Sequence, residues 1–213
     1  MSLKAPKTSP VTGVILAGGK SRRMGENKAL LQLGGDSLIG HVIHRMRLVT
    51  DELLLITNNP TEYKHLDLPM YEDILPNTGA LGGIHTGLSY ASHDAVLCVA
   101  CDSPFLDPKL ITYLTSLLGG HDAVIPYTFR GDTGQMTLQT LCAVYSKRCL
   151  PIIKRMLQER EFRVHAIYER AHIKRIPPEV WRKFDPEGMS FFNINTPEDF
   201  DRATTSMRSQ TQQ

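Results

Sequence analysis

Glycines and basic residues are concentrated in one short stretch near the start of the chain, residues 16–28, with the sequence LAGGKSRRMGENK. Gly18 and Gly19 carry no side chains where the chain must turn after an apolar segment, so backbone N–H groups can approach an oxyanion closely. Four cations fall within nine residues of the same turn: Lys20, Arg22, Arg23 and Lys28. This combination is suited to holding several phosphate charges. Two common phosphate loops are excluded, because the stretch contains neither GxxxxGK(S/T) nor GxGxxG.

A carboxylate, Asp102, directly follows the apolar segment at residues 95–101, AVLCVAC. Such a segment predicts a buried strand, and α/β proteins bind ligands in the crevice beyond the carboxyl ends of their strands. Mg²⁺ is usually held by one or two carboxylates together with substrate phosphates and water. Asp102 is therefore the candidate metal ligand, and a simple turn cap is the alternative for this position.

Short apolar runs alternate with longer stretches of helical spacing, and these elements must position the candidate residues. Strands are predicted at residues 11–17, 52–57, 69–72, 95–100 and 123–126. Helices are predicted at 37–49, at 84–91 and at 108–118. Ser37 is placed as an N-cap and Pro108 as a first-turn proline. The alternation is typical of an α/β fold, a doubly wound, mostly parallel sheet with helices on both faces.

The part of the chain after residue 126 is less regular. We expect a strand at 137–145, a helix at 150–157 and two short extended pieces at 164–167 and 173–176. Thr196 and Pro197 mark the start of a last helix. The polar residues 204–213 are expected to fray, and residues 1–10 to be a flexible N-terminus. The simplest organisation is a single domain over residues 11–203.

Composition excludes several classes of protein. With 24 Lys and Arg against 22 Asp and Glu in 213 residues, the formal charge of +2 provides no global field for a nucleic acid. No apolar run is long enough to span a membrane. Four cysteines without an apolar leader indicate a cytoplasmic protein. Cys98 and Cys101 are spaced like half a zinc site, but residues three apart on a strand point to opposite faces, which favours buried structural thiols.

Four motifs together resemble those of one family. Residues 16–29 are similar to the signature LAGGxSxRMGxxKA of nucleotidyltransferases that make molybdenum cofactor dinucleotides, in particular the MobA family of molybdenum cofactor guanylyltransferases. Three further motifs follow in the order the family shows: TGALGGIHTGL at 78–88, CDSPFL at 101–106 and NINTPED at 193–199. One motif alone occurs in many NTP transferases, but four in this order are specific.

The resemblance implies a Rossmann-like fold of the nucleotide-diphospho-sugar transferase type. It further implies Mg²⁺-dependent transfer of GMP from GTP to molybdenum-bearing molybdopterin, with release of pyrophosphate. Residues 11–126 would then form the nucleotide-binding half and residues 127–203 the acceptor-binding half. The residues themselves support the reaction type, because in-line transfer to an acceptor phosphate depends on positioning and charge neutralisation rather than on a nucleophilic side chain. GTP and the molybdopterin cofactor are the substrates expected, with other molybdenum cofactor proteins as possible partners.

The family's site residues can be carried onto matching positions. The expected catalytic residues are Arg22, Arg23, Lys28 and Asp102, with Asp102 also the magnesium ligand. Nucleotide binding is expected at Leu16, Ala17, Gly18, Gly19, Lys28, Asn58, Asp73, Gly79, Leu81, Gly82 and Asp102. Two positions stay ambiguous by one residue, because Asn59 competes with Asn58 and Glu72 with Asp73. Ala80 stands where the family usually has proline, a change that alters no functional group.

The acceptor side is less well determined. Its expected residues are Gln139, Arg163, Asn193 and Asn195, because a charged pterin phosphate needs hydrogen-bond donors and an arginine fork. Asn195 together with Thr196 could instead serve only to cap the last helix. Two alternative functions stay open at this point. One is a cytidylyltransferase of the same fold, acting on the molybdenum cofactor or on a sugar or alcohol phosphate, and the other is a nucleotide-binding adaptor without turnover.

Overall fold

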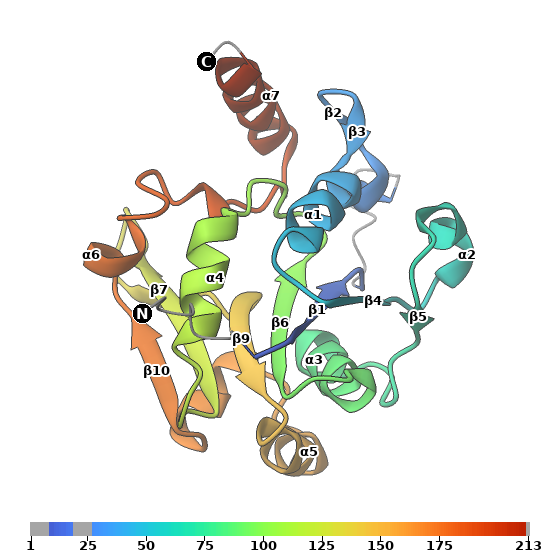
Figure 1. Cartoon of the computed structure of the whole chain (residues 1–213), viewed down its shortest axis with the longest axis vertical. Coiled ribbons are helices and arrows are strands. Elements are labelled where there is room, and N and C mark those ends of the chain that lie inside the picture. Colours follow the sequence, from blue (N-terminus) through green and yellow to red (C-terminus); the bar gives the residue numbers. More distant parts are fainter. Residues whose placement is uncertain (1–8, 19–26, 212–213) are drawn as a thin grey trace, which may run out of the picture.

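The computed structural model describes residues 9–18 and 27–211, and its centre is an eight-stranded sheet (Figure 1). Its strands are β1 (Val11–Leu16), β4 (Glu52–Ile56), β5 (Met70–Tyr71), β6 (Ala95–Ala100), β7 (Ala123–Phe129), β8 (Met136–Leu138), β9 (Cys142–Ser146) and β10 (Ile173–Ile176). They are ordered β10-β7-β9-β6-β1-β4-β5, and β8 pairs with β7 outside this path. A separate hairpin joins β2 (Gln32–Leu33) to β3 (Asp36–Ser37).

Most of the strand pairs are parallel. β1 pairs in parallel with both β4 and β6, so Val14 lies between Leu54 and Cys98. β5 and β10 add parallel strands at the two ends of the sheet. β9 is antiparallel to both of its neighbours, β6 and β7. The predicted fold class, a mostly parallel sheet with helices on both faces, is therefore confirmed.

Helices cover both faces of the sheet (Figure 1). One face packs against α1 (Leu38–Arg47), α4 (Pro108–Ser116) and α6 (Pro178–Trp181), and the other against α3 (Gly79–Tyr90) and α5 (Cys149–Gln158). The alternation of side chains along a strand explains this division, because Ile15 enters the first layer while Val14 and Leu16 enter the second. Two further helices are α2 (Pro60–Tyr63) and α7 (Pro197–Thr211).

The predicted helix starts at Ser37 and Pro108 are confirmed, and polar side chains fix both. The Ser37 hydroxyl accepts a hydrogen bond from the backbone N–H of Gly40 at 3.1 Å, which caps α1. α4 begins with Pro108 in its first turn, and the Asp107 carboxylate before it accepts two backbone N–H bonds, at 2.8 and 2.9 Å. Such caps satisfy N–H groups that have no partner within a helix.

Two predictions for the second half of the chain are wrong. The strand expected at 137–145 is two strands separated by a turn. The Gln139 N–H still bonds to the carbonyl of Pro126 on β7, but the Gln139 carbonyl accepts from the Cys142 N–H and so closes the turn. The segment expected to be extended at 164–167 is instead a 3-10 helix, Val164–Glu169. Its apolar residue Ile167 is fully buried under the sheet, so the short helix is stabilised by packing.

The tail expected to fray from residue 204 is also different, because α7 continues as a helix to Thr211. Ala203 is fully buried in a small apolar cluster with Leu33 of the β2–β3 hairpin and Ile194. Phe200 and Met207 pack against the same cluster one helical turn to either side. Tertiary packing therefore stabilises a helix that the polar composition of residues 204–213 does not predict. The flexible N-terminus was expected at 1–10, and residues 1–8 lie outside the described part of the chain.

Strands from both predicted halves of the chain share this one sheet. β9 belongs to the half after residue 126, yet it lies between β6 and β7. All five residues of β9 are buried. The two halves are thus interleaved at the centre of the sheet rather than placed side by side as separate layers.

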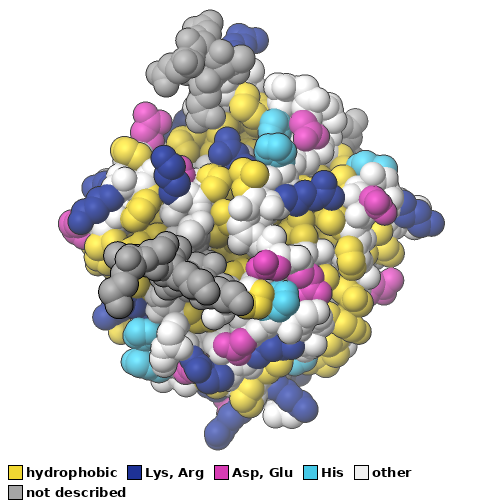
Figure 2. Space-filling model, viewed as in Figure 1, with side chains coloured by type: hydrophobic (Ala, Val, Ile, Leu, Met, Phe, Trp, Pro, Cys, Tyr) yellow, Lys and Arg dark blue, Asp and Glu magenta, His cyan; other side chains and the backbone are white. Residues whose placement is uncertain are grey.

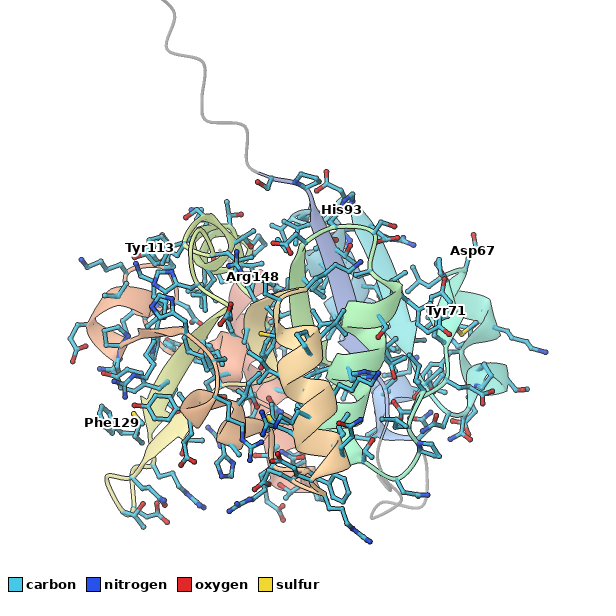
Figure 3. The ribbon with its side chains drawn as sticks, turned by 90° about the horizontal axis from the view of Figure 1, so that it is seen from below. Asp67, Tyr71, His93, Tyr113, Phe129 and Arg148 are labelled. Atoms are coloured by element: carbon cyan, nitrogen blue, oxygen red, sulfur yellow. The ribbon has the colours of Figure 1, made fainter. Side chains whose placement is uncertain are left out.

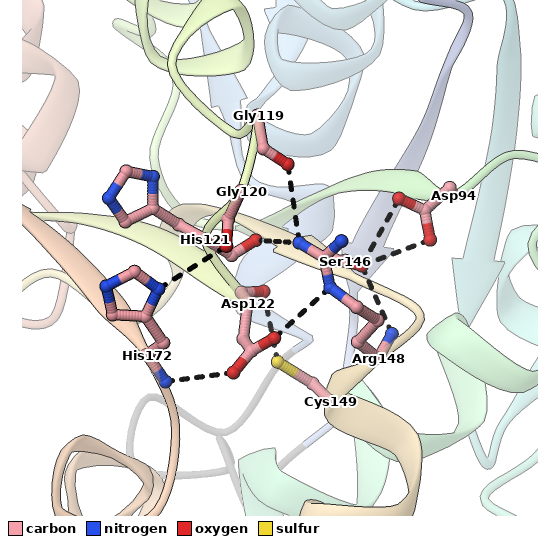
Figure 4. Close-up of polar contacts among 9 residues, drawn as sticks. All are labelled: Asp94, Gly119, Gly120, His121, Asp122, Ser146, Arg148, Cys149 and His172. Atoms are coloured by element: carbon pink, nitrogen blue, oxygen red, sulfur yellow. Dashed lines mark hydrogen bonds and ion pairs between the residues drawn. The ribbon is translucent and has the colours of Figure 1, made fainter.

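A polar cluster joins several elements at the amino ends of β6 and β7 (Figure 4). Asp122 accepts from the Arg148 guanidinium at 3.2 Å and from the backbone N–H of His172 at 2.9 Å. Ser146, at the end of β9, donates to Asp94 at 3.0 Å and accepts from the Arg148 N–H at 3.1 Å. These contacts connect the starts of two strands with the end of a third and with the start of α5. They therefore stabilise the edge of the sheet that lies opposite the candidate site.

The surface agrees with the nearly balanced charge of the chain. On the face shown in Figure 2, the described Lys and Arg side chains are spread among acidic, histidine and apolar side chains. Within residues 9–18 and 27–211, no helix is both long enough and apolar enough to cross a membrane.

Candidate functional site

The carboxyl ends of four neighbouring strands, β5, β4, β1 and β6, lie at one edge of the sheet. Backbone hydrogen bonds continue this ladder beyond the strands themselves. Ala17 donates to Ile56 at 2.9 Å, and Cys101 donates to Leu16 at 3.2 Å. The residues that follow these strands therefore emerge close together, as the crevice of an open α/β sheet requires.

At the centre of this edge, three side chains from distant parts of the sequence meet around the ammonium group of Lys28. Its Nζ lies 2.7 Å from Oδ2 of Asp102 and donates to Oδ1 of Asn195 at 2.9 Å. The Lys28 side chain is only 8% exposed, and that of Asp102 is 17% exposed. A buried ammonium group is tolerated because it has a carboxylate and an amide oxygen as partners. Since an ammonium group has three N–H donors, one is left for a ligand.

The turn that carries Asp102 is fastened to the segment at residues 193–195. The Asp102 carbonyl accepts from the Ile194 N–H at 3.1 Å, and the Ser103 hydroxyl donates to Oδ1 of Asn193 at 3.0 Å. Ile194 is fully buried, so the two asparagines on either side of it are held against the site. The structure thus brings Asn195 to Lys28 and Asn193 to Ser103, the residue that follows Asp102. Their predicted role in binding the acceptor stays a prediction.

One oxygen of Asp102 has no hydrogen-bond partner among the described residues. Oδ1 is buried and makes no hydrogen bond within the described residues, while Oδ2 binds Lys28. A buried polar atom without a partner is costly, and such atoms often mark places where a ligand or ion supplies the missing contact. A carboxylate oxygen is the type of donor that Mg²⁺ prefers. Asp102 therefore fits its predicted role as a metal ligand.

A second carboxylate lies along the same edge. Asp73 accepts from the amide Nδ2 of Asn58 at 2.8 Å, and its backbone N–H donates to Oδ1 of Asn58 at 3.0 Å. Its other oxygen, Oδ1, is buried without a partner in the described part of the chain. Glu72 is exposed, and Asn59 precedes helix α2. Asn58 and Asp73 therefore face one another, whereas the alternatives Asn59 and Glu72 do not take part in this contact.

The motif at residues 78–88 is helical from its second residue, which corrects the helix start predicted at Ile84. Gly79 begins α3 with φ of +64°, a conformation that glycine adopts without strain. Gly82 lies inside the first turn, where a Cβ atom would come within 1.8 Å of the Thr78 hydroxyl. Leu81 is fully buried in the core. Gly79 is therefore the exposed member of the three predicted residues, and Leu81 and Gly82 could contact a nucleotide only through their backbone.

The loop after β1 is described only in part. Leu16 and Ala17 are buried at the end of the strand, and Gly18 is exposed with open space where a Cβ atom would stand. That space is compatible with the predicted approach of a phosphate to the backbone. Gly19, Arg22 and Arg23 lie outside the described residues, so their predicted roles remain predictions.

Two predicted acceptor residues do not contact the group around Lys28. Gln139 donates through Nε2 to the hydroxyl of Thr128, at 2.7 Å. Arg163 is exposed and pairs with Glu161 at 2.6 Å, and this hydrogen bond raises the pKa of Arg163. Neither side chain has a hydrogen bond or ion pair to the candidate site within the described residues. Their predicted role would require a ligand large enough to extend from the site.

Cys98 and Cys101 do not form a metal site. Cys98 packs in the layer under α3 and α5, whereas Cys101 packs against the opposite layer. Burial, with a further contribution from Asp102, raises the pKa of Cys101 to about 12, so its thiol stays protonated at neutral pH. No group of three His, Cys, Asp or Glu residues able to hold a metal occurs in the described part of the chain.

Sequence reasoning missed two residues beside the site, Asn27 and Tyr63. Asn27 directly precedes Lys28, and its side chain bonds to the Tyr63 hydroxyl. The position of Asn27 next to a candidate catalytic lysine was a usable signal. Tyr63 gave none, because in the sequence it is only an aromatic residue near a turn.

The strand order, with charged groups at the carboxyl ends of the central strands, is that of an open α/β domain whose ligand crevice lies at those ends. Comparison with known families makes the class specific. The family model described as the MobA-like NTP transferase domain matches residues 13–175, and the chain belongs to this family.

Similar proteins extend the comparison over nearly the whole chain. The chain is 36% identical over 200 residues to the molybdenum cofactor guanylyltransferase of Desulfosudis oleivorans, a match that covers 93% of this chain and 96% of the relative. It is also 36% identical over 192 residues to a probable molybdenum cofactor guanylyltransferase of Pelotomaculum thermopropionicum, covering 90% and 91% of the two chains.

Solved structures show the same fold. Molybdopterin-guanine dinucleotide biosynthesis protein A from Archaeoglobus fulgidus superposes with a TM-score of 0.79 at 26% identity, covering 93% of this chain and 99% of the other. The 2-C-methyl-D-erythritol 4-phosphate cytidylyltransferase of Thermus thermophilus superposes with a TM-score of 0.67 at 16% identity, covering 92% and 98%. The second likeness concerns the fold alone.

Proposed function

We propose that this protein is a molybdenum cofactor guanylyltransferase. It transfers GMP from GTP to a phosphate of molybdenum-bearing molybdopterin, which forms the guanine dinucleotide of the cofactor and releases pyrophosphate. The proposal is supported by relatives of that name at 36% identity over nine-tenths of the chain. The observation that carries the chemistry is the buried ammonium group of Lys28 at the carboxyl edge of the sheet.

The reaction replaces one phosphoanhydride bond by another. An oxygen of the acceptor phosphate attacks the α-phosphorus of GTP, and the bond from that phosphorus to the bridging oxygen of pyrophosphate breaks. Negative charge grows on the departing pyrophosphate and spreads over the transferred group, so fixed cations lower the barrier. Lys28 is fixed by Asp102 and Asn195 and directs its remaining N–H at the phosphates.

The site residues also fit a divalent metal, which nucleotidyltransferases of this family generally use. We propose Mg²⁺, held by the unpaired Oδ1 of Asp102 together with the phosphates of the substrate. When bound, the ion would neutralise phosphate charge and orient the triphosphate. The dependence on phosphates agrees with the lack of a three-residue ligand group among the described residues.

The remaining contacts divide between the two substrates. We propose that Asn58 and Asp73 contact the nucleoside part of GTP, with the backbone at Gly18 and Gly79 close to the nucleotide. Arg22 and Arg23 would neutralise the triphosphate. Gln139, Arg163, Asn193 and Asn195 are proposed for the acceptor, although Asn195 also holds Lys28. We propose a cytoplasmic location, because the four described cysteines are free thiols. We further propose that the enzyme works with other proteins of molybdenum cofactor biosynthesis or molybdoenzyme maturation.

The test is pyrophosphate release from each of the four NTPs with Mg²⁺, with and without molybdenum-loaded molybdopterin. Release that requires both GTP and the acceptor is the expected result. Release with CTP would overturn the guanine specificity and favour a cytidylyltransferase. Binding of GTP without release would favour the adaptor.

Two substitutions test the site assignment in the same assay. Lys28→Ala and Asp102→Asn should each lower turnover by about 100-fold or more, because the first removes a cation that neutralises developing charge and the second removes the carboxylate that fixes Lys28 and is proposed to hold Mg²⁺. Lys109→Ala is a matched control, since Lys109 is exposed on α4 and contributes only a backbone N–H to the Asp107 cap. Wild-type turnover in both site variants would exclude this assignment.

A further inference from the structure

Helix α2 contacts the turn that carries Lys28, at a point distinct from the substrate-binding groups. Asn27 precedes the 3-10 turn Lys28–Leu30, and its Oδ1 accepts from the Ala29 N–H at 3.1 Å, so its side chain caps the turn. The amide nitrogen of Asn27 donates to the Tyr63 hydroxyl at 2.8 Å. The same nitrogen also donates to the carboxylate of Glu62. Both partners belong to α2.

The hydroxyl of Tyr63 is held at the side-chain amide of Asn27. The residue is only 3% exposed, and its ring packs in the layer beneath α1. Its hydroxyl lies 2.8 Å from the nitrogen and 3.2 Å from the oxygen of the Asn27 amide. Burial raises the pKa of Tyr63 to about 12, so the phenol keeps its proton at neutral pH and can donate as well as accept.

We propose that Tyr63 and Asn27 form a positioning pair for Lys28. The ring of Tyr63 is anchored in the core and its hydroxyl fixes the Asn27 amide. That amide then fixes the backbone turn from which the Lys28 side chain extends. Rigid support of this type matters because a catalytic group must be held within a fraction of an ångström of its productive position. The inference rests on the proposed role of Lys28 in nucleotidyl transfer.

The position of α2 in the chain strengthens the argument. Asn58, which holds Asp73, lies five residues before Tyr63. The segment at 58–63 therefore supports two charged residues of the edge. Asn58 bonds to Asp73, and Tyr63 supports Lys28 through Asn27. A displacement of α2 would disturb both at once.

The test compares Tyr63→Phe with Tyr113→Phe. The first removes the hydroxyl and keeps the ring. Tyr113 also packs against the same apolar layer, its ring is stacked on Phe184, and its hydroxyl has no hydrogen bond among the described residues. Tyr113 lies on the opposite side of the molecule from Tyr71, a residue of β5 (Figure 3). Tyr63→Phe should lower kcat for pyrophosphate release about fivefold to tenfold with KM for GTP within about twofold, and Tyr113→Phe should change neither.

A second variant separates positioning from general damage. Asn27→Ser keeps an oxygen that can cap the turn but is too short to reach Tyr63. It should lower kcat by at least a similar factor, because it also removes the bond from Asn27 to Glu62. The double variant should lose no more than Asn27→Ser alone, because the Tyr63–Asn27 contact is already absent in that variant. Multiplying losses, or a rise in KM with kcat unchanged, would overturn the proposal.

A spectroscopic readout keeps this test independent of turnover. In protein labelled with ¹³C at the lysine ε-carbon, the Lys28 resonance is assigned by its loss in Lys28→Arg. Tyr63→Phe should shift or broaden that resonance, and Tyr113→Phe should leave it unchanged. An unchanged resonance in Tyr63→Phe would refute the proposal. Failure of wild-type protein to use GTP would instead refute the proposed function.

Discussion

Replacing Lys28 by methionine should destabilise the protein by an amount that depends on Asp102. The two side chains have similar length, so the substitution removes the charge with little change in volume. It leaves the Asp102 carboxylate, 17% exposed, without its cation, and leaves the Asn195 oxygen without its donor. Breaking a buried ion pair from one side typically costs 3–5 kcal/mol, and the residual exposure of Asp102 favours the lower end, about 3 kcal/mol.

The assay is thermal unfolding, followed by calorimetry in buffer with a chelator so that no metal binds to Asp102. In a chain of this length, 1 kcal/mol changes Tm by roughly 2–4 °C, so Lys28→Met should lower Tm by roughly 6–12 °C. The double variant Lys28→Met with Asp102→Asn should recover most of this loss, because no uncompensated charge is then buried. Both variants should lack turnover.

Two results would refute this reasoning. An unchanged Tm in the single variant would mean that the Lys28–Asp102 pair is hydrated in solution. If the loss of Tm in the double variant equals the sum of the losses in the two single variants, charge pairing is not what stabilises this edge.

Three further results are expected. Asn58→Ala should raise KM for GTP about fivefold with a smaller effect on kcat, because it removes the two hydrogen bonds that hold Asp73; an unchanged KM would contradict this. Burial alone would raise the pKa of Asp199, but two backbone N–H groups at the start of α7 lower it below its usual value of 3.8. The resulting stability is present above pH 4 and is lost as the pH falls through the lowered pKa. Asp199→Asn should therefore lower the free energy of unfolding by urea by about 1 kcal/mol at pH 7, and the difference between the variant and the wild type should shrink in acid. Because burial raises the pKa of Cys101 to about 12, iodoacetamide at pH 8 should label this thiol in the folded protein at least about 100-fold more slowly than free cysteine. Mass spectrometry measures the labelling, and rapid labelling would show an exposed thiolate.

Much of the fold could be predicted from local patterns. The β-branched run before Gly18 and the apolar run before Asp102 became β1 and β6, because central parallel strands are buried on both faces. Ser37 and Pro108 marked helix starts because caps are local interactions. The interruption after Gln139 is a turn closed by the Cys142 N–H, and the stretch TLQTLCAVY contains no glycine or proline that would mark a turn.

The candidate site likewise has a part that local sequence patterns predict and a part that they do not. Asp102 could be predicted because its position at the end of an apolar strand is a property of a few adjacent residues. Lys28 and Asn195 were also expected at the site, but their contacts could not be predicted, since Lys28 lies 74 residues from Asp102 and 167 residues from Asn195. Asn195 was assigned to the acceptor or to a helix cap, and its bond to Lys28 gives it an additional role.

The central position of β9 has a consequence for how the chain is made. Synthesis releases the N-terminal part first, and β1, β4, β5 and β6 are complete once Ala100 has emerged. The strand that covers the open edge of β6 is antiparallel β9, which ends only at Ser146. Until then the nascent chain carries an apolar strand with unpaired N–H and C=O groups, the type of edge that recruits other chains. A fragment that stops at residue 126 should therefore aggregate, because residues 11–126 acquire a protected edge only when the later part of the chain supplies β9.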